Sequence, residues 1–225
     1  MQKNSDLSLL KKRNTWVFDL DNTLYPNTPN LFAQVDKKMT EFIMEHLNLD
    51  FEPARKLQKE YYANHGTTLS GLMKHHNVKP NHFMDSVHAI DYSPIKRCDV
   101  LINALNNMNV KKYVLTNGTK NHAVCVLKRL GLEGAFDGLF GIEDCNFIPK
   151  PEAKTYEIFM DKFNVVADKS VFVEDMAKNL SVPKDMGFKT VYVKTDCPYA
   201  SSDLFEDKID YKCDNIGDFL ASIGH

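Results

Sequence analysis

Two aspartates, Asp19 and Asp21, carry the strongest chemical signal in the sequence, and they directly follow the apolar run 15–18. Side chains alternate along a strand, so two acids spaced in this way point to the same side if the strand continues. Neighbouring carboxylates repel each other, and a divalent cation is one means of compensating that repulsion. The pair alone is equally compatible with a solvated turn after a strand, or with a site for a cation.

A second polar group, Thr116-Asn117-Gly118, follows the apolar run 113–115. A hydroxyl and free backbone amides at a strand-to-helix junction can hold phosphate oxygens. An ordinary turn is the competing interpretation of these three residues.

Two later features add charge of both signs. Lys150 precedes Pro151, which we expect to be the first residue of a helix, and a lysine there supplies a point charge for a phosphate. Glu174 and Asp175 form a second acidic pair at the end of the apolar run 171–173. Taken singly, these residues also suit a surface lysine and a solubilising strand end.

The elements that must position these groups follow from the apolar pattern. Short runs rich in β-branched or aromatic residues alternate with stretches of helical period, such as 151–163; the runs are 15–18, 113–115, 171–173 and 190–193. This alternation predicts an α/β fold with a parallel sheet and helices on both faces. Ligands bind at the carboxyl ends of such strands, so we expect the polar groups to converge there.

Residues 26–94 interrupt this pattern. They contain no convincing strand, and their apolar residues fall at helical spacings, which predicts a small helical bundle. Pro26 and Pro94 stand where the chain would leave and re-enter the sheet domain. We therefore expect one domain formed by 14–25 and 95–225, and an inserted helical domain formed by 26–94.

Composition limits the possible partners. The 225 residues carry a net charge of −2, with acids and bases mixed, which favours neither a nucleic-acid polymer nor a membrane surface as partner. Five widely spaced cysteines without a CxxC pair indicate reduced thiols and a cytoplasmic location. No run approaches the roughly 20 apolar residues of a membrane helix. Monomer and homodimer are both open.

The four polar groups resemble, in order and type, the motifs of the haloacid dehalogenase superfamily, with Asp-x-Asp-x-Thr at 19–23 as the most specific. The resemblance spans 16–193. It implies a Rossmann-like core with an inserted helical-bundle cap, and a magnesium-dependent phosphatase that forms an aspartyl-phosphate. In that mechanism Asp19 is the nucleophile, and Asp21 protonates the leaving group and later activates water.

The same resemblance implies the remaining roles. Mg²⁺ would be held by Asp19, the backbone carbonyl of Asp21 and the acidic pair, with Asp175 favoured over Glu174 as the direct ligand. Thr116 and the amides of Asn117 and Gly118 would bind the phosphate group, and Lys150 would neutralise its charge. Thr23 would support the Asp21 loop through a side-chain-to-backbone bond, and Asn179 would orient the acidic pair. Turn or capping roles are equally open for the last two residues.

The segments 21–26 and 61–73 resemble the pyrimidine 5'-nucleotidase branch. This implies a small phosphorylated metabolite as substrate, namely a pyrimidine nucleoside 5'-monophosphate, recognised by Tyr62, Gly66, Thr67 and Thr68. The aromatic residues of the segment could instead fill the core of the helical domain. Three other functions stay open: a phosphatase for a sugar phosphate or phosphoglycolate, a dehalogenase, which Asp21 argues against, and a non-catalytic phosphometabolite binder.

Overall fold

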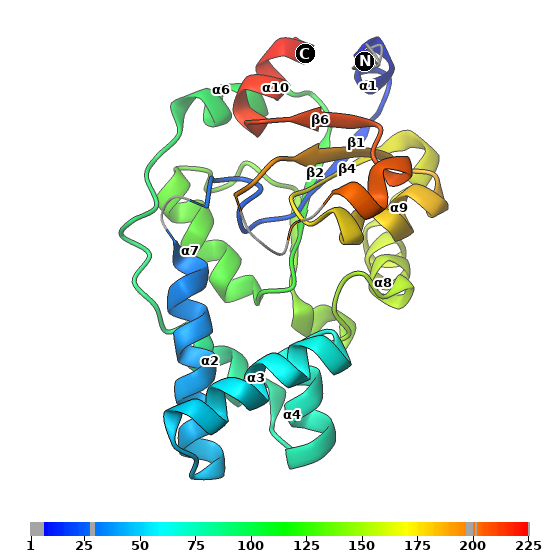
Figure 1. Ribbon diagram of the computed structural model, residues 1–225. Coiled ribbons are helices and arrows are strands. Elements are labelled where there is room, and N and C mark those ends of the chain that lie inside the picture. The colour runs from blue at the N-terminus through cyan, green and yellow to red at the C-terminus, as the bar shows by residue number, and fades with distance from the viewer. Residues whose placement is uncertain (1–6, 28–29, 197–199, 201, 225) are drawn as a thin grey trace. The chain divides into compact units, whose positions relative to one another are not determined.

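The computed structural model describes residues 7–27, 30–196, 200 and 202–224. The chain divides into two compact units, a larger one formed by Met1–Thr28 and Ile95–His225, and a smaller one formed by Pro29–Pro94 (Figure 1). Each unit has its own core.

The larger unit is built on a sheet that has six strands among the described residues, and every neighbouring pair is parallel. In spatial order the strands are β3 (Gly138–Phe140), β2 (Lys111–Leu115), β1 (Thr15–Phe18), β4 (Ser170–Glu174), β5 (Lys189–Val193) and β6 (Tyr211–Cys213). The predicted parallel α/β sheet is confirmed. Its edge strands β3 and β6 are short, and neither stood out in the sequence.

The two central strands, β1 and β4, are buried along their whole length. A parallel strand covered by helices on both faces has no solvent side, so its sequence is apolar at successive positions rather than at alternate ones. Trp16, Val17 and Phe18 follow this rule in β1, as do Val171 to Val173 in β4. The register sets Phe18 beside Val173, so the two strands end at the same edge of the sheet.

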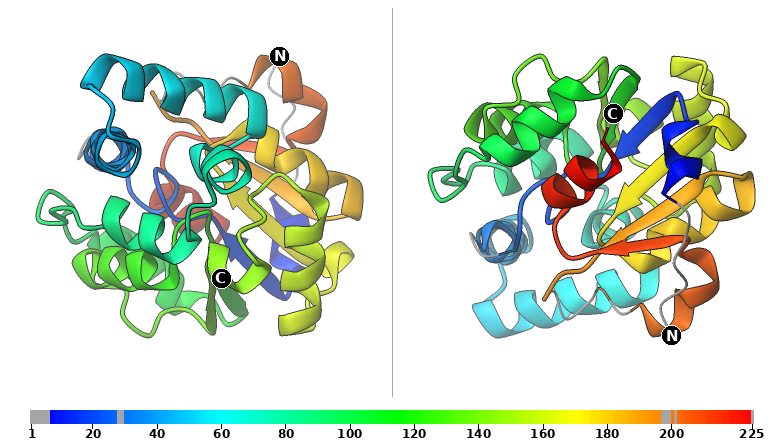
Figure 2. Two further views of the ribbon diagram at one scale, coloured as in Figure 1. Left: turned by 90° about the horizontal axis from the view of Figure 1, so that it is seen from below. Right: turned by 90° about the horizontal axis from the view of Figure 1, so that it is seen from above.

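Helices flank the sheet on both faces (Figure 2). They are α1 (Ser8–Lys11), α6 (Asp99–Asn107), α7 (Lys120–Leu130), α8 (Ala153–Phe163), α9 (Ser181–Met186) and α10 (Ile216–Ile223), joined by the 3₁₀ turns η1 (Ile142–Cys145), η2 (Ala167–Lys169), η3 (Ala177–Leu180) and η4 (Asp203–Lys208). Among the described helices of the chain, none is both long enough and apolar enough to span a bilayer.

The smaller unit consists of four helices in its described part: α2 (Leu31–Leu47), α3 (Phe51–His65), α4 (Thr68–His76) and α5 (Pro80–Val87). Phe42 of α2 packs edge-on against Phe83 of α5, with ring centroids 5.1 Å apart. Gly66 ends α3 at a φ of 78°, a conformation that glycine adopts without strain. Thr67 then caps α4 by accepting a bond from the Ser70 amide.

Aromatic packing attaches α8 to the sheet, and it generates a stability prediction. Phe159 is 1% exposed and its ring meets those of Tyr113 and Phe140 edge-on. We expect Phe159→Ala to lower the free energy of unfolding by about 3–5 kcal/mol, because the lost contacts leave a cavity. Urea denaturation measures this value. Val124→Ala on the exposed face of α7 is the control, with an expected change within about 0.5 kcal/mol.

Candidate active site

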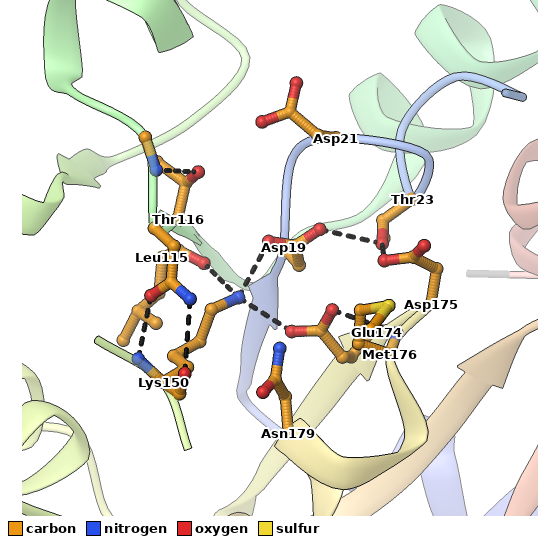
Figure 3. A network of polar contacts seen from close by, with 12 residues as sticks. Asp19, Asp21, Thr23, Leu115, Thr116, Lys150, Glu174, Asp175, Met176 and Asn179 are labelled. Atoms are coloured by element: carbon orange, nitrogen blue, oxygen red, sulfur yellow. Dashed lines mark hydrogen bonds and ion pairs between the residues drawn. The ribbon is translucent and has the colours of Figure 1, made fainter. Parts of the chain in front are cut away.

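Asp19 lies immediately beyond β1, and its surroundings hold both of its carboxylate oxygens. Its backbone amide donates to the carbonyl of Val173 at 2.9 Å, which extends the pairing with β4 by one residue. Oδ1 accepts a bond from Lys150 Nζ at 2.7 Å, and Oδ2 accepts one from the Thr23 hydroxyl at 3.0 Å (Figure 3). Asp19 is only 6% exposed, so this carboxyl group is held at a fixed position.

Lys150 occupies the centre of the polar cluster and is 3% exposed. Its ammonium group bonds Asp19 Oδ1 and Glu174 Oε2 at 2.7 Å each, and the carbonyl of Leu115 at 3.1 Å. Burial alone would lower the pKa of Lys150, but the charges of Asp19 and Glu174 outweigh burial and raise it. The ammonium therefore stays charged and connects the ends of β1, β2 and β4.

The backbone of Lys150 is fixed by Asn117 and not by a helix. Asn117 Oδ1 accepts from the Lys150 amide at 2.7 Å, and its Nδ2 donates to the Lys150 carbonyl at 3.2 Å. The expected start of a helix at Pro151 is wrong, because Glu152 has a non-helical ψ of 128° and α8 begins at Ala153.

Glu174 is the last residue of β4 and Asp175 follows it, and both are almost fully buried. Glu174 uses both oxygens within the protein, since Oε1 accepts from the Met176 amide at 3.1 Å and Oε2 from Lys150. Asp175 Oδ1 lies 3.5 Å from the Thr23 hydroxyl, and its Oδ2 has no hydrogen-bond partner among the described residues. One carboxylate oxygen each from Asp19, Glu174 and Asp175 lie within 4.8 Å of one another.

These carboxyl groups carry more negative charge than one lysine can balance. Burial and the charge of Glu174 raise the pKa of Asp19 to about 7, although Lys150 acts in the opposite direction. Burial, followed by the charges of Glu174 and Asp19, raises the pKa of Asp175 well above its usual value. The cluster therefore favours a further positive charge.

Asp21 is oriented differently from the expectation that it points the same way as Asp19. The strand ends at Phe18 and residues 21–24 form a turn, so the alternation of a strand no longer applies. The Asp21 carboxylate points away from the acidic cluster (Figure 3), and it is 37% exposed.

Thr116 follows β2 and is buried. Its hydroxyl accepts a bond from the Gly118 amide at 2.9 Å. In this conformation the Gly118 amide is used by Thr116, and phosphate binding by that amide stays a prediction. The backbone of Thr116 is itself tied to β3 through the Phe140 carbonyl at 3.0 Å.

This arrangement agrees with what comparison with known proteins shows. A family model described as haloacid dehalogenase-like hydrolase matches residues 16–193. The chain belongs to this family. The resemblance noted from the four motifs is thus confirmed at the level of the family, and the matched residues include both acidic pairs, the Thr116 loop and Lys150.

The chain is also similar to two curated relatives and to one solved structure. Phosphate metabolism protein 8 of Saccharomyces cerevisiae is 28% identical over 212 residues, which are 85% of this chain and 65% of that protein. The chain thus spans less than two thirds of the yeast relative. Glyceraldehyde 3-phosphate phosphatase of Methanocaldococcus jannaschii is 25% identical over 199 residues, which are 79% of this chain and 83% of that protein. A HAD phosphatase from Thermococcus onnurineus has the same fold, with a TM-score of 0.63, 18% identity, and coverage of 94% of this chain and 98% of that chain.

The acidic cluster of this chain fits a magnesium ion. All of its side-chain ligand atoms are carboxylate oxygens, which are the ligands that Mg²⁺ prefers. Asp175 Oδ2 is buried and unpartnered among the described residues, whereas both Glu174 oxygens are engaged. The geometry therefore favours Asp175 over Glu174 as the direct ligand.

The two expected supporting residues differ in what they do. Thr23 bonds the side chain of Asp19 and not a backbone group, so it holds the Asp19 carboxyl group directly, and the expectation of a side-chain-to-backbone bond is wrong. Asn179 lies in η3 with its side chain buried, and its Oδ1 has no hydrogen-bond partner among the described residues. Its backbone carbonyl accepts from the Tyr156 hydroxyl at 2.8 Å.

The four residues expected to select the substrate all lie in the smaller unit, around the break between α3 and α4. Tyr62 is half-buried on α3, and Gly66 and Thr67 form the break. Thr68 is buried and donates its hydroxyl to the Gln58 carbonyl at 3.3 Å, so that group stabilises the unit itself. Recognition of a base by these residues stays a prediction.

Two residues beside Asp21 were missed at the level of sequence. The Tyr25 hydroxyl donates to Asp21 Oδ1 at 2.5 Å, and His122 Nε2 lies 2.8 Å from the same oxygen. Burial lowers the pKa of His122, but the charge and hydrogen bond of Asp21 outweigh burial and raise it. The available signal was Thr119, whose type and position indicate a helix cap that places His122 in the first turn after β2.

The unpartnered oxygen of Asp175 generates a prediction about metal binding. We expect Mg²⁺ to raise the thermal midpoint of the wild type, since binding to the folded state alone adds about 2.7 kcal/mol at 100 times the dissociation constant. Asp175→Asn should abolish this shift. It should also unfold at a higher temperature than the wild type in chelator, because it removes a buried charge. Differential scanning calorimetry measures both effects.

The exposed Asp168→Asn is the matched control and should keep the wild-type response to magnesium. An equal magnesium shift in Asp175→Asn and wild type would contradict the assignment of Asp175 as a ligand.

Proposed function

We propose that this hydrolase is a magnesium-dependent phosphatase that acts through an aspartyl-phosphate on Asp19. The observation that supports this most directly is the pair of environments around two nearby acids. Asp19 is buried and held by Lys150 and Thr23, as a nucleophile needs, whereas Asp21 lies apart from the lysine and is partly exposed. The names of the two curated relatives, one a phosphatase and one a protein of phosphate metabolism, support the same class of reaction.

The reaction proceeds in two steps. In the first, a carboxylate oxygen of Asp19 attacks phosphorus, the bond from phosphorus to the leaving oxygen breaks, and Asp21 donates a proton to that oxygen. In the second, Asp21 takes a proton from water, the water oxygen attacks phosphorus, and the bond to Asp19 breaks to release inorganic phosphate. Atoms and charges balance over the two steps, and Asp19 and Asp21 return to their initial states.

The other residues stabilise charge. Lys150 favours the ionised, attacking form of the Asp19 carboxyl group, against burial and the charge of Glu174, and it balances the negative charge of the phosphoryl group. When bound by Asp19, Asp175 and the Asp21 backbone carbonyl, Mg²⁺ supplies additional positive charge at the phosphoryl oxygens. The Thr116 loop binds the transferring group, with its hydroxyl buried at the end of β2.

We further propose a pyrimidine nucleoside 5'-monophosphate as the substrate, and a cytoplasmic location. The resemblance of 21–26 and 61–73 to the pyrimidine 5'-nucleotidase branch supports the substrate. The described cysteines Cys98, Cys125, Cys145 and Cys213 are free thiols, which suits a reducing compartment. The archaeal relative, named for a triose phosphate, favours a second candidate, which is a phosphatase for a small phosphorylated sugar.

The other two functions have less support. Dehalogenation releases halide, a weak base that needs no proton, so it gives no role to the Asp21 side chain. A non-catalytic binder would not need a nucleophile held by both oxygens next to a partly exposed acid.

A panel of phosphorylated metabolites tests the substrate. We expect phosphate release to be fastest from uridine or cytidine 5'-monophosphate and to require magnesium, with chelator lowering the rate at least 100-fold. A malachite-green assay measures release for each compound with and without the metal. Equal or faster release from glyceraldehyde 3-phosphate or phosphoglycolate would reject the nucleotide assignment while leaving the phosphatase intact.

Asp19→Asn tests the nucleophile. The amide is close to isosteric with the carboxylate, so the fold should persist, but the amide cannot form the acyl phosphate. We expect a loss of kcat of at least about 10⁴-fold, with circular dichroism unchanged. Phosphate transferred from a ³²P-labelled substrate should label the wild type at Asp19 after acid quenching. Labelling of Asp19→Asn, or turnover close to wild type, would exclude this role.

A further inference from the structure

We propose that Tyr25 and His122 are positioning residues that clamp the Asp21 carboxyl group, so that it serves the leaving group and water and does not join the acidic cluster. The inference rests on the proposed phosphatase function and adds two residues to it. Both residues belong to the larger unit, on the turn after β1 and on the first turn of α7.

The clamp holds both oxygens of Asp21. Oδ1 accepts from the Tyr25 hydroxyl at 2.5 Å and lies 2.8 Å from His122 Nε2, while Oδ2 lies 3.1 Å from the same nitrogen. The Asp21 side chain is 37% exposed, whereas that of His122 is 3% exposed. A partly exposed carboxyl group ordinarily samples several rotamers. Two buried partners on different elements restrict it to one.

This restriction matters because the alternative is close by. Asp19, Glu174 and Asp175 form a cluster that suits a cation, and a fourth carboxylate turned toward it could bind that cation. An aspartate bound in this way could no longer donate a proton. Figure 3 shows Asp21 directed away from the cluster, as the contacts with Tyr25 and His122 require.

His122 itself contacts residues 118 and 119, which follow Thr116. Its amide donates to the hydroxyl of the helix cap Thr119 at 3.2 Å. A Cβ atom on Gly118 would lie 2.9 Å from His122 Cδ2, closer than packed atoms allow, and would make a tight contact of 3.3 Å with Thr116 Oγ1. Glycine at this position therefore lets the imidazole reach Asp21. The loop that follows Thr116 and the two residues that hold Asp21 are thus packed together.

Comparing the activity of variants on substrates with different leaving groups distinguishes a misplaced acid from a general loss of structure. An alkoxide departs only with a proton, whereas p-nitrophenolate departs without one. The value of kcat/KM reports the steps up to departure of the leaving group, and therefore excludes the later attack by water. A variant that misplaces Asp21 should lose kcat/KM for an alkyl phosphate and keep it for p-nitrophenyl phosphate.

The experiment compares variants on two substrates, uridine 5'-monophosphate, or the best alkyl phosphate of the panel, and p-nitrophenyl phosphate. For His122→Leu we expect kcat/KM to fall at least about 100-fold on the alkyl ester and less than about 3-fold on the aryl ester. Asp21→Asn serves as the reference and should show the same selectivity. His122→Gln, which can place an amide near the position of Nε2, should recover at least about 10-fold on the alkyl ester.

Two further variants keep the test decisive. Tyr25→Phe removes one hydroxyl from a retained ring, so it tests the clamp even if His122→Leu does not fold, and we expect an approximately 10-fold loss confined to the alkyl ester. Thr190→Val is the control for destabilisation, since it loses the buried bond to the Lys208 carbonyl far along the chain from the clamp. It should leave the ratio of the two substrates unchanged.

The outcomes distinguish two failures. A wild type inactive on both substrates would overturn the proposed phosphatase and the clamp with it. An active wild type whose His122→Leu and Tyr25→Phe variants lose both substrates equally, or whose His122→Gln variant recovers nothing over His122→Leu, would overturn the clamp alone.

Discussion

The buried ammonium of Lys150 is the interaction on which the site depends. It lies between Asp19 and Glu174 at 2.7 Å from each, although 131 residues of sequence separate it from Asp19. Removing one member of a buried ion pair leaves a charge without compensation, at a cost of about 3–5 kcal/mol. The ammonium also bonds the Leu115 carbonyl, so a single group ties together the ends of three neighbouring strands. Catalytic geometry and sheet geometry are in this way coupled.

One ammonium does not neutralise three buried carboxyl groups, and the excess has a use. Burial, together with this excess negative charge, raises the pKa of Asp19 and of Asp175, which means that ionising them without a cation works against folding. A protein built only for stability would replace such a group with a neutral one. Retaining it favours binding of a divalent cation, and Asp175 Oδ2, which has no hydrogen-bond partner among the described residues, is the atom best suited to bind one.

Much of this arrangement could be predicted from sequence because parallel strands share an edge. The strands β1, β2 and β4 could be recognised from their apolar residues. The polar residues after each strand had to meet at the carboxyl ends of these strands. The edge strands β3 and β6 could not be predicted from sequence, since each has only three residues and depends on a neighbouring strand for its conformation. Helical periodicity likewise indicated the helices of the smaller unit.

The contacts that sequence could not predict are those made across turns. The pairing of Asn117 with the Lys150 backbone joins two loops 33 residues apart, and no local pattern encodes it. The bond from Gly118 to Thr116 depends on the ψ angles of one turn, and the clamp on Asp21 depends on where β1 ends. The spacing of residues predicts which face of a helix or strand a side chain occupies, but it makes no such prediction for residues in a turn.

Asp19 and Asp21 show why that loss matters for chemistry. Had the strand continued through residue 21, both carboxylates would face the same ammonium and the same cation site, and both would be stabilised as anions. The turn at 21–24 separates them instead. Asp19 faces the buried ammonium, which opposes the effect of burial on its pKa, while Asp21 faces a phenol and an imidazole in a partly exposed setting. A strand that ends at Phe18 therefore gives two acids, within three residues of chain, different partners and different exposure.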